Sequence, residues 1–181
     1  ERQTTIGGQT FGLQELTAAE VAAEVRITPR AGDIFFQAPP IQATKRINLH
    51  SAGKEMGLSL GTVDRVRMGY LFGTRERASG ALKHALLFQS NFVEGSDRYV
   101  SAALTDGTPL QFTVTRAPDP CIPNCYPVIE ALIIAVPDAT LRAQQTSGLP
   151  LLITLDSGQV IHTIGLPAYV QGYLAAVDRY R

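Results

Sequence analysis

Residues 62 to 73 alternate between two sets of side chains, and this alternation limits the possible folds more than any other feature of the chain. Successive side chains of a β-strand point to opposite faces of a sheet, so a period of two indicates a strand. One face carries Tyr70 and Phe72, and the other carries Arg65 and Arg67. We therefore predict a strand that is buried on one side only, with Tyr70 and Phe72 on the buried side.

The same kind of pattern recurs along the chain. After a Ser79-Gly80 turn, one face of the next strand carries Leu82, His84, Leu86 and Phe88. Further strands are expected at residues 33 to 37, 45 to 49, 98 to 104, 109 to 115, 128 to 136, 150 to 155 and 159 to 164. Asp106-Gly107 and Asp156-Ser157-Gly158 favour tight hairpins between neighbouring strands, because these residues tolerate the backbone angles of a short turn.

Three short helices complete the expected elements. Thr17 can cap the first helix while Glu20 reaches back to the cap, which is the pattern of a capping box. A second helix is expected at residues 138 to 146, and a third from Pro167 to Arg179. The third helix has an apolar stripe of Val170, Tyr173, Leu174 and Val177, with Gly172 allowing a close backbone approach.

Together these elements predict a mainly β fold with short helices. We expect an antiparallel β-sandwich or a curved sheet, with helices at the N- and C-terminal ends. The length of 181 residues suits one domain, which we assign to residues 15 to 181. Residues 1 to 14 are polar, contain glycine and lack periodicity, so we interpret them as a flexible N-terminal arm.

Charge and hydropathy exclude two classes of protein. Basic and acidic residues are equal in number at 16 each, which argues against electrostatic binding of nucleic acid. No apolar run approaches the roughly 20 residues of a transmembrane helix. The chain opens at Glu1 and not at Met, so we expect that a signal peptide was removed before this point.

Cys121 and Cys125 are the only cysteines, in a loop with prolines at 120, 123 and 127. They form either a disulfide or a clip for a soft metal ion. A disulfide would close a five-residue ring worth about 2 kcal/mol, so it would shape the loop before the strand at 128 to 136. Disulfides persist in oxidising compartments, and this reading therefore predicts a periplasmic or secreted protein.

Copper is the alternative for this pair. Two thiolates and a histidine can hold Cu(I), and the alternative ligand set is Cys121, Cys125 and His162. The arrangement is similar to that of cytochrome-oxidase assembly copper chaperones. Those proteins have a thioredoxin-like fold, whereas the surroundings of this pair are expected to be all β.

No catalytic constellation accompanies these residues. His50, His84 and His162 share no metal-ligand spacing, and we expect His84 and His162 to be residues of a sheet face. The sequence lacks a G-x-S-x-G elbow, a phosphate-binding loop and a dinucleotide fingerprint. We therefore nominate no catalytic residue and no cofactor, and we do not expect an enzyme.

The order of elements in residues 121 to 181 resembles a known family. Cys-Ile-Pro-Asn-Cys at 121 to 125 precedes a strand, a short helix through Leu141, and a strand pair that ends in Ile164-Gly165-Leu166 before Tyr169 and a terminal helix. This order resembles the C-terminal part of the invasion-associated locus B proteins, which are small exported proteins of Gram-negative bacteria with a β-sandwich fold. The resemblance implies an envelope location, a Cys121–Cys125 disulfide and no known catalysis.

These observations give two functional hypotheses. The first is an exported periplasmic or envelope β-sandwich that binds another envelope protein or complex without catalysis, with the N-terminal arm and the cysteine loop, including Tyr126, as contact surfaces. The second is a carrier of a small ligand or copper. Its ligand would lie between the sheet and the terminal helix, or at Cys121 and Cys125.

Overall fold

The computed structural model describes residues 2–6, 9–13, 17–39, 66–92, 98–118, 128–158, 160–165 and 167–180. The helices are α1 (Ala18–Glu24), α4 (Asp138–Ala143) and α5 (Pro167–Asp178). The strands are β1 (Arg2–Ile6), β2 (Gln9–Leu13), β3 (Arg26–Pro29), β4 (Asp33–Gln37), β5 (Val66–Glu76), β6 (Leu82–Phe92), β7 (Tyr99–Leu104), β8 (Pro109–Leu110), β9 (Phe112–Pro118), β10 (Val128–Val136), β11 (Leu149–Leu155) and β12 (Val160–Gly165).

The strands form three sheets in which all pairs are antiparallel. A six-stranded sheet has the order β3-β4-β5-β6-β10-β9, and a four-stranded sheet has the order β12-β11-β7-β8. β1 and β2 form a separate hairpin within residues 2–13, where the sequence suggested no regular structure. The strand expected at 45 to 49 lies outside the described residues.

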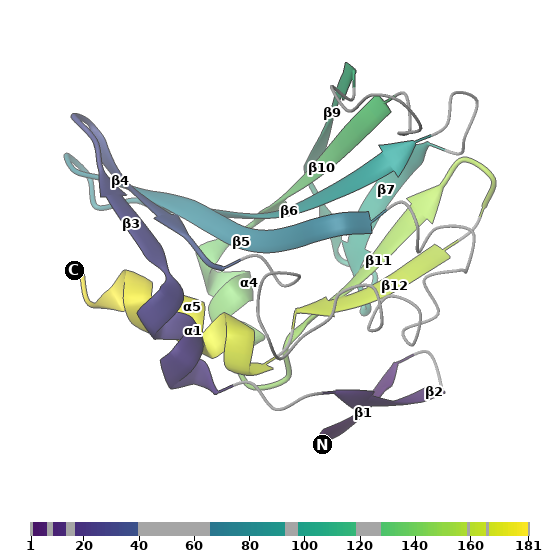
Figure 1. The fold of residues 1–181 in the computed structure, drawn as a ribbon, viewed down its shortest axis with the longest axis horizontal. Helices are drawn as coiled ribbons and strands as arrows, with labels where there is room; N and C mark the ends of the chain where they lie inside the picture. The colour runs from purple at the N-terminus through teal and green to yellow at the C-terminus, as the bar shows by residue number, and fades with distance from the viewer. Residues whose placement is uncertain are drawn as a thin grey trace.

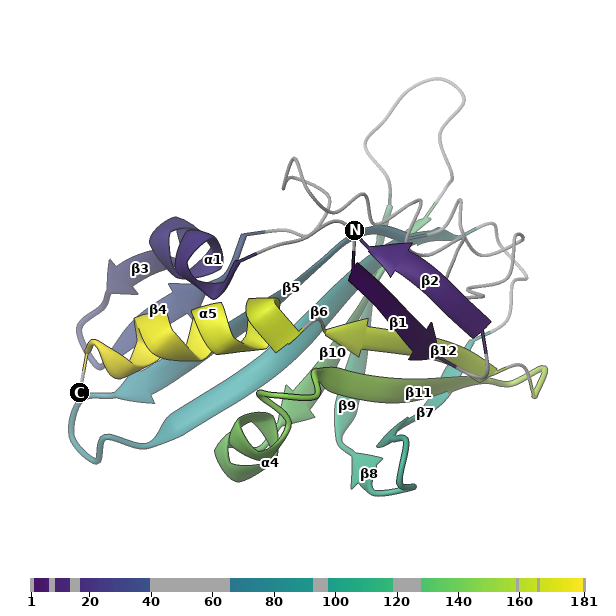
Figure 2. The same cartoon turned by 90° about the horizontal axis from the view of Figure 1, so that it is seen from below.

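Both the helices and the four-stranded sheet lie on one side of the six-stranded sheet (Figure 1). Seen from below, α5 lies across β5 and β6, while β11 and β12 lie beside it toward β9 (Figure 2). The core fills the space between these layers, and its largest fully buried side chains include Tyr169, Tyr173, Phe36, Leu132 and Leu151. The predicted β-sandwich with terminal helices is confirmed.

The helices begin and pack as the sequence indicates. Thr17 accepts a hydrogen bond from the Glu20 amide, and the Glu20 side chain accepts one from the Thr17 amide, so the capping box is present. The four residues of the expected apolar stripe of α5 are buried. A Cβ atom at Gly172 would lie 2.5 Å from the Ala18 carbonyl oxygen, which confirms the close approach of α5 to α1.

The prediction of which side of β5 is buried was wrong. Leu71 and Gly73 face the helices and are buried, whereas Tyr70 and Phe72 point to the other side and are half-buried. Small residues explain this arrangement, because a Cβ atom at Gly73 would lie 2.5 Å from the Tyr173 hydroxyl oxygen. The glycine leaves room for a large side chain that comes from α5, 100 residues further on.

The strand expected at 109 to 115 is divided between the two sheets. β8 pairs with β7, and the Ala102↔Leu110 pair lies in the four-stranded sheet. After Gln111 the chain enters β9, which pairs with β10 in the six-stranded sheet. The crossing at Gln111 joins the two layers at one corner of the sandwich.

Candidate functional site

His84 lies on the inner side of β6, and both of its ring nitrogens are occupied. Nδ1 lies 2.9 Å from the Tyr173 hydroxyl oxygen, and Nε2 lies 2.9 Å from Oδ1 of Asp138. A carboxylate only accepts hydrogen bonds, so Nε2 carries the proton and Nδ1 accepts from the tyrosine hydroxyl. This assignment makes the imidazole neutral and satisfies both nitrogens.

Arg142 extends this contact to the end of α5. Its Nε donates to both oxygens of Asp138, at 3.1 and 2.9 Å. Its two terminal nitrogens donate to the two oxygens of Asp178, at 3.0 and 2.9 Å. Tyr173, His84, Asp138, Arg142 and Asp178 therefore form one chain of hydrogen bonds, here named the His84 relay, which joins β6, α4 and α5.

Burial and charge act in opposite directions within the relay. Burial lowers the pKa of His84 and outweighs the hydrogen bond that His84 donates to Asp138, which raises the pKa. Burial would raise the pKa of Asp138, but hydrogen bonds from Arg142 and His84 hold it below its usual value. Burial also raises the pKa of Tyr173, so its hydroxyl stays protonated. A neutral imidazole between a protonated tyrosine and a carboxylate follows from these shifts.

The geometry of the His84 relay indicates a structural role. A general base needs a nitrogen within hydrogen-bond reach of a substrate proton, and the His84 side chain is 0% exposed with both nitrogens bonded. What the relay does is to fix the positions of α4 and α5 beneath the sheet. Tyr169 does the same nearby, because its hydroxyl donates to the Pro39 carbonyl and accepts from the Leu71 amide.

On its other side, the six-stranded sheet presents an apolar surface that no described element covers (Figure 1). The strands β4, β5, β6, β10 and β9 contribute to this surface, here named the outer face. One row across the strands is Gln37, Phe72, Ala85 and Ala135, and the next is Tyr70, Leu87, Ile133 and Thr113. Arg26 on β3 continues the first row beyond Gln37 and is exposed, and the other residues of the two rows are uncharged.

Aromatic side chains concentrate at the β4–β5 end of the outer face. The Phe72 ring centroid lies 6.1 Å from that of Phe35 and 6.1 Å from that of Tyr70. The guanidinium of Arg30 stands 4.3 Å from the Phe35 ring centroid, at the distance of a cation–π contact. These aromatic residues shield one another only partly, since Phe35, Tyr70 and Phe72 are all half-buried.

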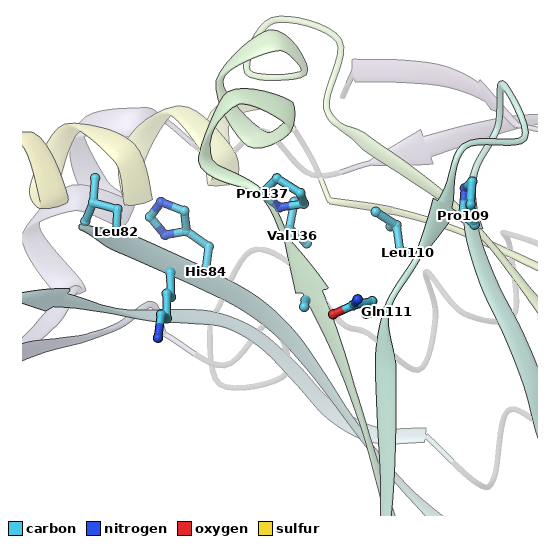
Figure 3. A pocket seen from close by; sticks show the side chains of 9 residues that line it. Leu82, His84, Pro109, Leu110, Gln111, Val136 and Pro137 are labelled. Carbon is cyan, nitrogen blue, oxygen red and sulfur yellow. The ribbon is translucent and has the colours of Figure 1, made fainter.

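A cavity of about 480 Å³ borders the outer face where β10 ends. β10 stops at Val136, opposite His84, while β6 continues to Leu82 and leaves a notch beside it. Figure 3 shows Leu82 and His84 pointing toward the helix-covered side of this notch. Lys83, Gln111 and Ala135 line it as well, together with Pro109, Leu110 and Pro137.

The residues nominated from the sequence lie elsewhere or outside the described part of the chain. Cys121, Cys125 and Tyr126 fall outside it, so the disulfide and the copper site stay predictions. His162 lies on β12 opposite Leu152. Among the described residues, no group of three or more His, Cys, Asp or Glu residues could hold a metal ion. None of the described helices is long and apolar enough to cross a membrane.

The sequence predicted that His84 is a residue of a sheet face, but it did not indicate the partners of His84. Asp138 lies 54 residues away and Tyr173 lies 89 residues away, and neither spacing carries a local signal. No protein-family model, curated protein or solved structure matches the chain.

Proposed function

We propose that this protein is an exported, non-catalytic assembly module of the cell envelope, and that its outer face binds another protein molecule. The observation that supports the proposal most strongly is the contrast between the two sides of the six-stranded sheet. One side carries the core, while the other offers Tyr70, Phe72, Leu87 and Ile133 without any cover among the described residues. A contiguous apolar patch on a soluble protein commonly marks an interaction surface.

The composition of the outer face fits a protein–protein contact. Protein interfaces have an apolar centre depleted in charge, aromatic anchors, and a polar rim. The centre here is formed by Phe72, Leu87 and Ile133, while Gln37 and Thr113 stand at the flanks. Aromatic residues such as Tyr70 and Phe72 are common anchors of binding energy.

The layers beneath the sheet hold this surface in one shape. The His84 relay and the Tyr169 hydroxyl attach α4 and α5 to the inner side of β5 and β6. A surface that is already ordered loses little conformational entropy when a partner binds. The relay therefore supports binding by fixing the backbone of the strands that carry the outer face.

The envelope location follows from the cysteine pair and the family resemblance. A Cys121–Cys125 disulfide requires an oxidising compartment such as the periplasm. The loop leads directly into β10, which supplies Ile133 and Ala135 to the outer face. Oxidation of the pair would then restrict how the chain approaches one strand of the binding surface.

Site-specific photo-crosslinking tests the proposed contact. Benzoylphenylalanine replaces Phe72 in the native host, and Val100 on β7 is the matched control because it is apolar and 51% exposed. We expect a defined crosslinked protein species from position 72 and none from position 100. The proposal fails if position 72 gives no crosslink, or if both positions give the same set of products.

The cavity favours a small-ligand carrier as a second candidate. Its volume of about 480 Å³ lies in the range of ligand pockets, and its lining is mostly apolar, with Lys83, His84 and Gln111 as the polar residues. Native mass spectrometry of protein from its own host tests this candidate, and a ligand lost on Ala135→Trp would support it. Copper retained by the reduced protein and lost in Cys121→Ser would support the metal carrier instead.

A further inference from the structure

We propose that a small pocket lined by Arg98, Tyr99, Val114 and Arg116, here named the arginine pocket, binds a small organic monocarboxylate. The two arginines hold the carboxylate of this ligand, and Tyr99 and Val114 contact its apolar part. The inference goes beyond the proposed function, since none of these four residues lines the cavity at the end of β10 or belongs to the two rows of the outer face.

The arginine pocket has a volume of about 230 Å³ and lies between one strand of each sheet. Arg98 and Tyr99 stand at the start of β7 in the four-stranded sheet, and the other two residues belong to β9 in the six-stranded sheet. Both strands lie on the side of the molecule away from α1 and α5 (Figure 1). Each sheet therefore supplies one arginine and one residue with an apolar surface.

Val114 and Arg116 stand on the inner side of β9. Val114 pairs with Leu132 of β10, which is 1% exposed and belongs to the core. Arg116 follows two residues later, so its side chain leaves the strand on the same side as that of Val114. Because Arg116 is exposed, the arginine pocket begins where the core between the two sheets ends.

A β-bulge on β7 sets the position of Tyr99. The residues of β7 that pair with consecutive residues of β11 are Ser101 and Tyr99, so Val100 is skipped. Val100 is 51% exposed, whereas Tyr99 is half-buried and packs against the core. A bulge of this kind redirects a side chain, and bulges are frequent next to functional sites.

Arg98 is fixed through its backbone, and its side chain is left for a ligand. Its amide donates to Oδ1 of Asp156 at 3.0 Å, and its carbonyl accepts from the Asp156 amide at 2.9 Å. Within the described part of the chain, no carboxylate forms an ion pair with the Arg98 guanidinium. A guanidinium can donate two parallel hydrogen bonds to one carboxylate.

The charges near the arginine pocket favour an anion with a single negative charge. Glu130 pairs with Arg116 in the register of β9 and β10, and Asp156 contacts the backbone of Arg98. These two acidic residues offset part of the positive charge of the arginines, so a doubly charged phosphate is attracted less than it is by unopposed cations. A carboxylate carries one charge and matches the planar donors of an arginine.

The volume and the lining limit the rest of the ligand. A water molecule takes about 30 Å³ in the liquid, so the arginine pocket has room for about eight non-hydrogen atoms. The ring of Tyr99 and the side chain of Val114 offer apolar contact to such a molecule. An acid of the size of benzoate therefore fits, with its carboxylate at the arginines and its ring against Tyr99.

Fluorine NMR with para-fluorobenzoate tests the inference on the purified full chain. We expect binding with a Kd of about 1 mM, as for a small ligand in a partly open pocket. Arg98→Gln should weaken binding about tenfold, because hydrogen bonds from a charged donor are lost. Arg179→Gln, at the exposed end of the chain, is the matched control and should bind as the wild type does. The uncharged para-fluorobenzamide should not bind.

Two further variants keep the result unambiguous. Arg116→Gln should weaken binding as well, and it decides the test if circular dichroism shows that Arg98→Gln is not folded. Ala135→Trp fills the cavity at the end of β10 and should leave binding unchanged.

Four results would overturn the inference. They are no binding to the wild type, equal binding of the benzamide, displacement of the probe by equimolar inorganic phosphate, and loss of binding in Ala135→Trp but in neither arginine variant. The outer face is tested separately by the crosslink from position 72, so failure of one proposal leaves the other standing.

Discussion

The hydroxyl oxygen of Tyr173 lies against the backbone of Gly73, so closely that a Cβ atom at residue 73 would come within 2.5 Å of it. The same Cβ atom would lie 2.9 Å from Nδ1 of His84. One glycine on β5 thus makes room for the hydrogen bond that links α5 to β6. The stability of the whole layer beneath the outer face depends on this close approach.

Gly73→Ala is expected to destabilise the protein by about 2 kcal/mol, because inserting a methyl group into a packed core forces side chains and backbone apart. Urea denaturation followed by circular dichroism measures the change. Gly32→Ala is the matched control, since a Cβ atom at Gly32 would meet nothing within 4 Å. Equal stabilities for the two variants would contradict the packing described here.

Tyr173→Phe removes only the hydroxyl group that donates to His84. The buried Nδ1 then lacks a partner, and we expect a loss of about 1–3 kcal/mol in the free energy of unfolding. Tyr180→Phe is the control, because Tyr180 is 46% exposed near the end of the chain. A Tyr173→Phe variant as stable as wild type would mean that the hydrogen bond between Tyr173 and His84 contributes nothing to the free energy of unfolding.

The stability of the protein should fall as the pH is lowered from about 6.5. The pKa of His84 is lowered in the folded state from its ordinary value of 6.5, so the unfolded chain binds this proton more readily than the folded one. The free energy of unfolding therefore decreases below pH 6.5 until the folded histidine also titrates. The pKa of Asp138 is lowered from 3.8 in the folded state, so the free energy of unfolding decreases a second time below pH 3.8.

Comparing wild type with His84→Gln isolates the histidine contribution. Thermal denaturation at a series of pH values from 5 to 8 measures the slope of stability against pH, as the linkage relation requires. We expect the variant to have a smaller slope below pH 6.5, whatever its absolute stability. An unchanged slope would assign the acid sensitivity to other groups.

Arg142→Lys tests the link between α4 and α5. The guanidinium of Arg142 donates two hydrogen bonds to Asp138 and two to Asp178. A lysine ammonium cannot reproduce this planar arrangement at both carboxylates. All three side chains are partly exposed, so solvent screening limits the expected loss to about 1 kcal/mol. Arg179→Lys at the exposed end of the chain should change nothing measurable, and a similar loss in both variants would argue against the bridge.

Local patterns in the sequence predicted the elements that local physics determines. The Thr17 capping box, the turns at Asp106 and Asp156, and the apolar stripe of α5 each depend on residues within a few positions of one another. Gly172 was predicted to allow a close approach, because a glycine inside an apolar helix stripe has few other uses. These features are present in the structure as expected.

Features that depend on distant partners escaped prediction. The alternation in β5 indicated which residues share a face, but the charges at Arg65 and Arg67 pointed to the wrong face as exposed. Gly73 reveals its role only beside Tyr173. The outer face was missed for the same reason, since half-buried Tyr70 and Phe72 read as core residues until the helices are known to lie on the opposite side.

Hydroxyl-radical footprinting measures directly whether the outer face is covered in the cell. Oxidation of Tyr70 and Phe72 is compared between protein in its native envelope and purified protein in dilute solution, where no other protein is present. We predict strong protection of both residues in the envelope, with Tyr180 oxidised equally in both samples. Equal oxidation of Tyr70 and Phe72 in the two samples would contradict the account.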